Sequence, residues 1–341
     1  MDRIRRNERL AAMTRILVES PNKIFTLGTF CEMFGAAKST LSEDIDILRG
    51  VFAQFHLGQL DTVTGAAGGV RYRPVLAPED AYRTVKDLAQ MLAAPGRVLP
   101  GGFIYMADIL AMPEVVERMG VIIASQFYRA EPDFVLTMET KGIPIAMMTA
   151  RALGVPTVIV RRDSKVYEGP AVNINYLSGS GSRVETMSLS RRAVREGQRA
   201  LIVVDFMRAG GTARGMVDMM REFSVTVVGV CVLISTKEPV KKRLDGVKSL
   251  LVIDETDESA GSANIHPANW LIQATGKAYA NGRRLMIRPK KRTISFFQRE
   301  RPCRRSRIGC FGKRRHICSL WSVWAIRAGN TPEQGTTSAS T

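Results

Sequence analysis

Residues 200–216 read Ala-Leu-Ile-Val-Val-Asp-Phe-Met-Arg-Ala-Gly-Gly-Thr-Ala-Arg-Gly-Met, and this stretch decides the fold of most of the chain. Residues 201–204 are a run of apolar residues, which is typical of a strand buried on both faces of a parallel sheet. Asp205 ends the run, and a short loop leads to Gly-Gly-Thr at 210–212. Glycines let backbone N–H groups approach an anion closely, and the threonine adds a hydroxyl. The stretch therefore predicts a strand, a phosphate-binding loop and a helix.

The spacing of this loop differs from two common phosphate motifs. The Gly-Lys-Ser/Thr of the Walker loop does not follow it, and the stretch has no Gly-x-Gly-x-x-Gly. The alternative interpretation is an ordinary strand-to-helix turn that needs glycines only for its geometry. The acid and the threonine at the two ends of the loop favour a ligand site.

Apolar segments alternate with helical patterns on both sides of this stretch. We expect strands at 134–136, 157–160, 201–204 and 225–234, and helices at about 145–153 and 213–223. Such alternation predicts a parallel sheet covered by helices, with ligands at the carboxyl ends of the strands.

Two further loops fall at such strand ends. Residues 137–144 contain Thr140, Lys141 and Gly142, a glycine loop with one cation that is suited to pyrophosphate. Residues 161–165 are basic and lead to a Gly/Ser-rich segment at 177–182, which is typical of a mobile lid. A single basic loop is usually only solvated, but three loops at corresponding strand ends favour one anion site.

The N-terminal part predicts a winged helix-turn-helix. Helical patterns cover about 10–17, 26–34 and 40–55, with a tight turn before the last, and strand-like runs at 59–63 and 70–73 form a hairpin wing. Recognition helices present small polar and basic side chains at their start, and wing arginines suit phosphates. The candidate DNA contacts are Arg5, Arg6, Lys38, Ser39, Thr40, Ser42, Arg71 and Arg73.

Two observations limit this DNA interpretation. A winged helix used only for protein contact is the alternative, with Ser39 serving as a helix N-cap. Glu43, Asp44 and Asp46 follow along the third helix, and such an acidic face would repel DNA. We therefore expect the helix to dock by its start and not along its length.

The 205–212 loop resembles the phosphoribosyl-pyrophosphate (PRPP) signature of type I phosphoribosyltransferases. Residues 1–258 resemble the pur operon repressors of Gram-positive bacteria. The resemblance rests on the winged helix and on the motifs at 96–105, 139–144, 160–165, 187–190 and 205–212. The resemblance implies a dimeric repressor of purine synthesis and transport genes, with operator DNA as partner. It also implies a phosphoribosyltransferase-like domain that binds PRPP as an inducer and performs no catalysis.

The resemblance also implies roles for the loop residues, with no resident metal. Asp205 would bind the ribose. The 5′-phosphate would be bound by the backbone of 207–211 and the Thr212 hydroxyl. The pyrophosphate would be bound by residues 140–142, together with Mg²⁺. The candidate effector residues are Thr140, Lys141, Gly142, Arg161, Lys165, Asp205, Phe206, Met207, Arg208, Ala209, Gly210, Gly211 and Thr212.

One residue departs from the family pattern. The family has two adjacent acids before Phe-Met, and Val204 stands in place of the first. A valine accepts no hydrogen bond from a ribose hydroxyl, which removes about 1–3 kcal/mol of possible ligand binding.

The C-terminal tail differs from the rest of the chain. Residues 281–341 hold 15 of the 49 lysines and arginines but only 2 of the 32 acids, so most of the net charge of +17 lies there. We interpret the tail as a disordered extension produced by a frame shift or misassembly. A basic nucleic-acid arm is one alternative, and a zinc site is disfavoured because the spacing is not Cys-x-x-Cys. The candidate zinc ligands would be Cys303, Cys310, His316 and Cys318.

Length and composition fit two folded domains. The chain has 341 residues and 45% hydrophobic content, and we expect domains at 1–75 and 76–270, followed by the tail at 271–341. We expect a cytoplasmic protein. The apolar runs are shorter than a membrane span, and the N-terminus does not resemble a signal peptide. Cys31 and Cys231 lie among apolar residues, as is typical of buried thiols in a reducing compartment. A purine phosphoribosyltransferase is the enzyme alternative, although catalysis has no use for a winged helix. An RNA-binding attenuator is disfavoured because no sheet face carries stacking aromatics.

Overall fold

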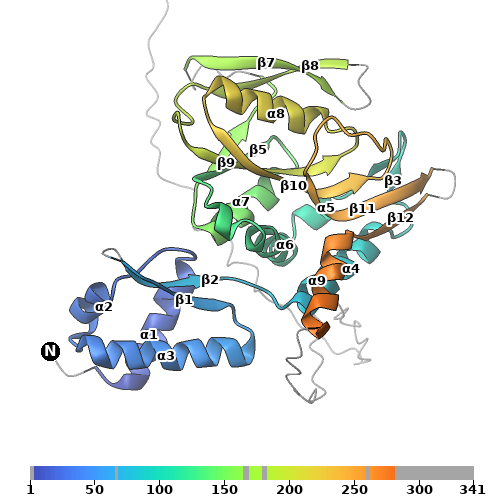
Figure 1. Ribbon diagram of the computed structural model, residues 1–341. Coiled ribbons are helices and arrows are strands. Elements are labelled where there is room, and N and C mark those ends of the chain that lie inside the picture. Colours follow the sequence, from blue (N-terminus) through green and yellow to red (C-terminus); the bar gives the residue numbers. More distant parts are fainter. Residues whose placement is uncertain (1–3, 66–67, 164–168, 179–182, 259–260, 281–341) are drawn as a thin grey trace, which may run out of the picture. The chain divides into compact units, whose positions relative to one another are not determined.

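The computed structural model describes residues 4–65, 68–163, 169–178, 183–258 and 261–280 (Figure 1). The chain divides into two compact units, Met1–Leu285 and Met286–Thr341, and all described residues belong to the first. The basic tail, its candidate zinc ligands, Lys165 and residues 179–182 of the expected lid lie outside the described residues.

The N-terminal part is the predicted winged helix. Helices α1 (Arg6–Glu19), α2 (Leu27–Phe34) and α3 (Lys38–Phe55) precede an antiparallel hairpin of β1 (Gln59–Val63) and β2 (Gly69–Arg73). The side chains that hold these elements together are buried and apolar, which confirms the helical spacing. They include Met13, Leu17, Phe30, Leu41, Phe52 and Tyr72.

Helix α3 begins two residues earlier than the sequence pattern predicts. Its N-cap is Ala37, which makes no side-chain capping bond, and Ser39 lies within the first turn. The interpretation of Ser39 as a helix cap is therefore wrong, and its hydroxyl remains exposed on the helix.

Short elements connect the winged helix to the sheet. They are α4 (Pro78–Leu92), the two-residue strands β3 (Val98–Leu99) and β4 (Phe103–Ile104), α5 (Ala107–Leu110), α6 (Pro113–Ser125) and the 3₁₀ turn η1 (Tyr128–Ala130). Pro78 and Pro113 stand at the first position of their helices, where the missing N–H costs no hydrogen bond.

A six-stranded sheet forms the second domain in the order β12-β11-β10-β9-β5-β6. The strands are β5 (Phe134–Met138), β6 (Thr157–Val160), β9 (Arg199–Met207), β10 (Thr226–Thr236), β11 (Lys248–Asp257) and β12 (Ser262–Pro267). All neighbours pair in parallel except β12, which runs antiparallel to β11. The predicted parallel sheet is therefore confirmed, with one antiparallel edge strand that the pattern did not predict.

The two faces of the sheet pack into separate cores. On β9, Leu201 and Val203 face the core formed with α4, α6 and α7 (Ile143–Leu153). Ala200, Ile202 and Val204 face the opposite core, with α8 (Gly211–Glu222). Alternate residues of one strand thus serve two cores, as expected for a sheet covered on both faces.

An antiparallel hairpin covers α8, and the sequence did not predict it. Strands β7 (Ala171–Ser178) and β8 (Arg183–Ser190) pair along their whole length and lie over α8 in Figure 1. Its residues Tyr176, Met187 and Leu189 are buried against the α8 core. Residues 177–178, which we expected in a lid, belong to β7.

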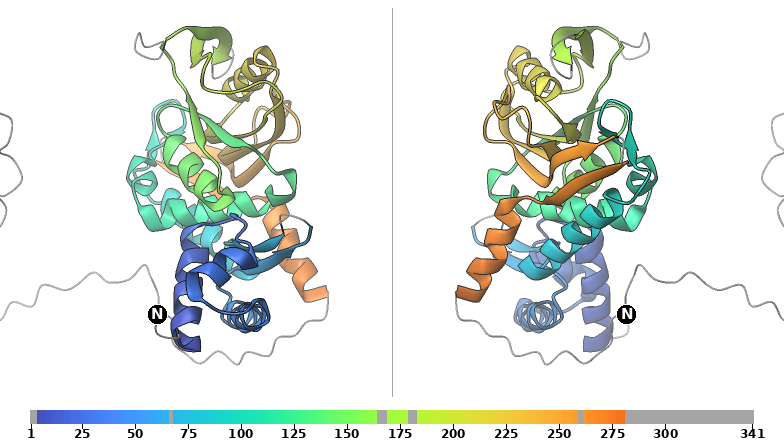
Figure 2. Two further views of the ribbon diagram at one scale, coloured as in Figure 1. Left: turned by 90° about the vertical axis from the view of Figure 1, so that its left-hand side faces the viewer. Right: turned by 90° about the vertical axis from the view of Figure 1, so that its right-hand side faces the viewer.

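Helix α9 (Asn269–Ala280) crosses the predicted domain boundary between 270 and 271. It contacts α4, and Figures 1 and 2 show the two helices side by side. Leu271 is buried in the same core as α4, so the first turns after the predicted boundary belong to the folded domain.

Candidate functional site

The predicted phosphate loop connects β9 to α8. Gly210 has φ +86°, a left-handed conformation that favours glycine, and it is the N-cap of α8. Residues 204–213 line one side of a cleft of about 1030 Å³. The loop therefore presents backbone N–H groups and the positive end of a helix dipole to the cleft, which is an arrangement suited to an anion.

Gly211 is required by a close approach of the hairpin. A Cβ atom at this position would overlap the backbone carbonyl of Leu177 on β7. The hairpin therefore rests directly on the start of α8, and Ser178, Arg183 and Glu185 complete that side of the cleft.

Asp205 lies partly buried at the carboxyl end of β9. Burial raises the pKa of its carboxyl, and hydrogen bonds from the N–H groups of Asp205 and Phe206, with Lys141 and Arg162 nearby, oppose the rise. A carboxylate that is desolvated but still partly compensated is suited to accept hydrogen bonds from ligand hydroxyls.

The second predicted loop lies beside the first. Thr140 and Lys141 line the cleft, and an added Cβ on Gly142 would overlap Thr137 Oγ1 and lie 3.7 Å from the backbone nitrogen of Asp205. Gly142 is also the N-cap of α7. The structure thus brings residues 140–142 and 205–212 together, as the sequence predicts for loops at neighbouring strand ends.

The third segment contributes a different arginine from the one predicted. Arg162 lines the cleft, whereas Arg161 does not. Glu139 connects the two, because its Oε1 accepts from the Arg162 N–H at 2.7 Å and its Oε2 lies 3.4 Å from Arg161 Nη1. The candidate Lys165 lies outside the described residues. Arg161 therefore contacts Glu139, which also binds the backbone of Arg162 beside the cleft.

Sequence reasoning missed a polar cluster on the hairpin. Tyr176 donates to Glu185 Oε2 at 2.7 Å, and Arg162 Nη1 lies 3.3 Å from the same oxygen. Burial and the Glu185 contact raise the pKa of Tyr176 to about 12, and the Tyr176 bond lowers the pKa of Glu185. The side chain of Thr212 opposes this rise in the pKa of Tyr176. The cluster therefore connects the hairpin to Arg162 beside the cleft.

Sequence reasoning also missed an apolar part of the cleft lining. It comes from β3, β4 and the residues around them, and its members are Leu99, Pro100, Phe103, Ile104 and Met106. The 96–105 motif contains most of these residues and is the sequence signal for this surface.

Val204 also lines the cleft, but it is 5% exposed and faces the α8 core. It pairs in register with Val232 of β10. A valine at this position packs well and leaves Asp205 as the carboxylate at the end of β9. Within the described residues, no group of three or more His, Cys, Asp or Glu side chains could hold a metal ion.

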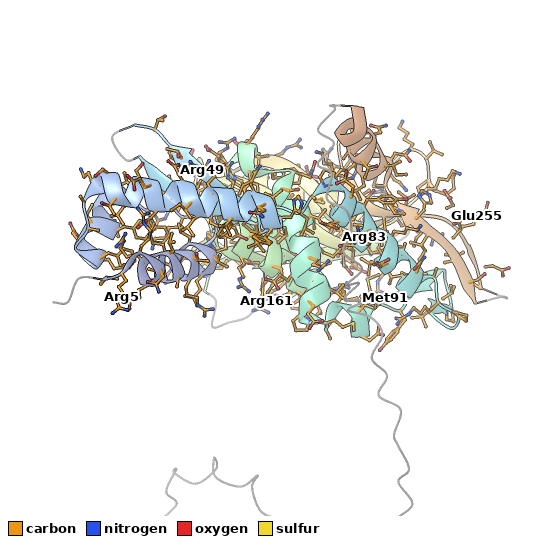
Figure 3. All side chains as sticks on the ribbon, turned by 90° about the horizontal axis from the view of Figure 1, so that it is seen from below. Arg5, Arg49, Arg83, Met91, Arg161 and Glu255 are labelled. Carbon is orange, nitrogen blue, oxygen red and sulfur yellow. The ribbon has the colours of Figure 1, made fainter. Side chains whose placement is uncertain are left out.

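The candidate DNA surface is the exposed first turn of α3. Lys38, Ser39 and Ser42 are exposed, and Thr40 is half-buried. Figure 3 shows the side chains along this helix, with Arg49 labelled on it and Arg5 labelled at the start of α1. The predicted polar and basic start of the helix is therefore accessible.

The expected acidic face of α3 is not an unpaired negative surface. Asp44 is fully buried and lies 2.8 Å from Arg9 Nε and 3.0 Å from Arg6 Nε. Arg6 Nη2 also lies 2.8 Å from Glu43, and Asp46 pairs with Arg49. Asp44 is therefore not part of an exposed acidic face, and the exposed Glu43 and Asp46 each have an arginine partner. Arg6, a predicted DNA contact, is committed to these pairs.

The two wing arginines are also engaged within the protein. Arg73 Nη1 lies 2.9 Å from Asp61, and Arg71 Nε lies 3.8 Å from the same carboxylate. Arg73 Nε donates to Asn22 at 3.2 Å, and its guanidinium lies 4.9 Å from the centroid of the Tyr128 ring. Burial lowers the pKa of Arg73. The contacts of Arg73 therefore hold it within the protein. Arg71 is the wing arginine with fewer contacts.

Comparison with known proteins adds independent evidence. The family model described as bacterial purine repressor, N-terminal, matches residues 5–74, and that of the phosphoribosyl transferase domain matches residues 107–264. The chain is 43% identical over 269 residues to the purine biosynthesis transcriptional repressor PurR of Bacillus subtilis (strain 168), which covers 79% of this chain and 94% of the relative. It is 40% identical over 266 residues to the purine biosynthesis transcriptional activator PurR of Lactococcus lactis subsp. lactis, covering 78% and 98%. It is 31% identical over 159 residues to xanthine phosphoribosyltransferase of Geobacillus thermodenitrificans, covering 44% and 79%.

Proposed function

The chain belongs to the family of purine biosynthesis transcriptional regulators, and from that premise we propose that it represses purine genes and is released from operator DNA by PRPP. The observation that carries the proposal is the cleft between the 140–142 and 205–212 loops, which combines an anion-binding helix start with Asp205 and Lys141. PRPP has the matching chemistry, because it joins a 5′-phosphate, two ribose hydroxyls and a pyrophosphate.

Each part of PRPP has a candidate partner in this cleft. Asp205 accepts hydrogen bonds from the ribose hydroxyls, and the N–H groups of 207–211 with the Thr212 hydroxyl bind the 5′-phosphate. Residues 140–142 bind the pyrophosphate. Mg²⁺ would enter with the ligand, since it is held by one or two carboxylates plus substrate phosphates more often than by an all-protein cage.

The protein is a regulator and not a transferase. Its regulator relatives are matched over 94% and 98% of their length and share the winged helix region, whereas the xanthine phosphoribosyltransferase matches only 44% of this chain. Val204 in place of an acid fits this conclusion, because a transferase must hold the ribose firmly while charge develops on it.

DNA binding uses the first turn of α3 in this proposal. Lys38, Ser39, Thr40 and Ser42 offer short side chains and one cation to base edges and phosphates. We expect a homodimer, because helix-turn-helix proteins that read two half-sites do so with two copies. None of the described helices is long and apolar enough to span a membrane, and a cytoplasmic location remains part of the proposal.

PRPP acts as an inducer only if it binds the DNA-free form more tightly. A tenfold loss of operator affinity requires about 1.4 kcal/mol of such a difference. PRPP brings several negative charges close to Lys141 and Arg162, which would otherwise help to attract DNA phosphates.

The test is a titration of labelled DNA from upstream of purine genes, followed by fluorescence anisotropy. PRPP with Mg²⁺ should release the DNA, whereas Mg²⁺ alone or ribose 5-phosphate at the same concentration should release little. Unchanged DNA affinity at saturating PRPP would contradict the inducer role. Formation of a nucleotide from PRPP and a purine base would contradict the assignment as a regulator without catalysis.

A further inference from the structure

The segment behind the phosphate loop holds two of the loop's carbonyl groups. Lys242 Nζ donates to the Arg208 carbonyl at 2.6 Å, and the Arg243 N–H donates to the Ala209 carbonyl at 2.9 Å. Thr236 Oγ1 lies 3.5 Å from the same Arg208 carbonyl. These contacts therefore brace the loop at two of its carbonyl groups.

Holding these carbonyls fixes the direction of the neighbouring N–H groups. Both peptide bonds are trans, since the cis bonds among the described residues are Glu139-Thr140 and Glu238-Pro239. In a trans peptide the C=O and the N–H point in opposite directions. The Lys242 and Arg243 contacts therefore turn the N–H groups of Ala209 and Gly210 away from the brace. Both residues line the cleft.

Lys242 does not act as a phosphate ligand itself. Its ammonium lies within hydrogen-bond distance of three acceptors: Arg208 O at 2.6 Å, Thr236 O at 2.7 Å and Thr236 Oγ1 at 3.3 Å. An ammonium has three N–H donors, so these contacts use all of them. Lys242 is also not among the residues that line the cleft.

We propose that Lys242 is a positioning residue for the effector: it preorganises the phosphate loop through the Arg208 carbonyl, so that loop N–H groups face the 5′-phosphate. This assignment rests on the proposed function, because it gives the loop its phosphate ligand. A loop whose donors are already aligned binds its ligand without a cost for ordering, so loss of the brace lowers affinity for the 5′-phosphate specifically.

The test compares Lys242→Met with Lys241→Met in the full-length protein. Lys241 is exposed and carries the same charge one residue away, which makes it the matched control for long-range electrostatics. Calorimetric titrations with PRPP, ribose 5-phosphate and pyrophosphate, each with Mg²⁺, separate the two loops. Lys242→Met should weaken PRPP and ribose 5-phosphate binding about 10-fold, or about 1.4 kcal/mol, and leave pyrophosphate binding unchanged.

A third variant, Lys242→Gln, separates the hydrogen bond from the charge. Glutamine keeps an N–H donor for the Arg208 carbonyl, so it should lose less affinity than methionine, and it serves in place of methionine if that variant fails to fold. Equal affinities in Lys242→Met and Lys241→Met would overturn the assignment, as would a parallel loss of pyrophosphate binding, which indicates a general structural defect. If the wild-type protein binds no PRPP, both the proposed function and the assignment of Lys242 fail. If the wild-type protein binds PRPP and Lys242→Met binds it with the same affinity, only the assignment of Lys242 fails.

Discussion

Asp44 is a buried charge that joins α1 to α3. It is 0% exposed and paired with Arg9, which is itself 7% exposed. Asp44→Ala leaves the Arg9 charge buried without its partner, so we expect the free energy of unfolding of the winged helix to fall by about 3–5 kcal/mol. Urea denaturation followed by circular dichroism measures this. Asp46→Ala is the control: its ion pair with Arg49 is exposed, and it should cost only about 0–1 kcal/mol. Equal losses would show that the Asp44 pair is not special.

The Asp205 carboxylate should lower the free energy of unfolding at neutral pH and should be required for tight binding of PRPP. Burial raises the pKa of its carboxyl, so the folded protein takes up a proton at a higher pH than the unfolded chain. The contribution of Asp205 to the free energy of unfolding therefore increases as the pH falls through the raised pKa. This contribution is lost as the pH increases. Asp205→Asn should raise the melting temperature at pH 7 and flatten its pH dependence. The same variant should weaken PRPP binding by about 1–3 kcal/mol and still bind DNA. A lower melting temperature at pH 7 would contradict the electrostatic argument.

Helix α8 and strand β7 meet at Gly211 without room for a side chain. The β7 strand is paired with β8 along its whole length, so the Leu177 carbonyl cannot move aside alone. Gly211→Ala should displace the hairpin or the helix start and weaken PRPP binding at least about 10-fold. It should also lower the melting temperature. Gly276→Ala in α9 is the control, because a Cβ there meets nothing within 4 Å and stabilises the helix by about 0.5–1 kcal/mol. Normal PRPP affinity in Gly211→Ala would show that the hairpin does not shape the site.

The first turn of α3 should carry both affinity and discrimination. Lys38 is exposed, and its ammonium is suited to a phosphate, so Lys38→Ala should weaken binding to all DNA sequences and reduce the salt slope by about 1. Thr40→Ala should reduce discrimination between operator and unrelated DNA more than affinity. Gel-shift titrations at two salt concentrations with both DNAs decide this. If neither variant changes binding, another surface reads the DNA.

The sequence predicted the elements whose burial follows from their own residues. Leu201 to Val204 are apolar on both faces, so the strand was evident, and the loops at its end followed from the rule for parallel sheets. The β7–β8 hairpin was not evident because its pattern mixes polar residues with Tyr176 and Met187, whose burial is provided by α8. The role of Arg73 was equally hidden, since its partner Asn22 lies 51 positions away. Partners far apart in sequence leave no local pattern.

Contacts within the folded unit connect the cleft to the wing. Gly142 of the second loop is the N-cap of α7, and the helix ends at Leu153, whose carbonyl accepts from Asn22 Nδ2 at 2.8 Å. Asn22 Oδ1 in turn accepts from Arg73 of the wing. A ligand that shifts the start of α7 therefore acts on a rigid element whose far end contacts the winged helix.

Asn22→Asp should weaken the coupling between PRPP and DNA without removing either binding event. The substitution keeps the shape and the acceptor for Arg73 but replaces the Nδ2 donor with an oxygen that repels the Leu153 carbonyl. Allosteric coupling is a free energy of about 1–3 kcal/mol and is reciprocal, so PRPP must lower DNA affinity by the same factor by which DNA lowers PRPP affinity. We expect this factor to fall several-fold in Asn22→Asp, measured from both directions, while the affinity of each ligand alone changes little. Lys23→Ala, at the adjacent position, should leave the factor unchanged. An equal coupling factor in the wild type and in Asn22→Asp would show that the coupling does not pass through α7. It would favour direct electrostatic competition between PRPP and DNA phosphates. Such competition predicts that the coupling factor depends strongly on salt concentration.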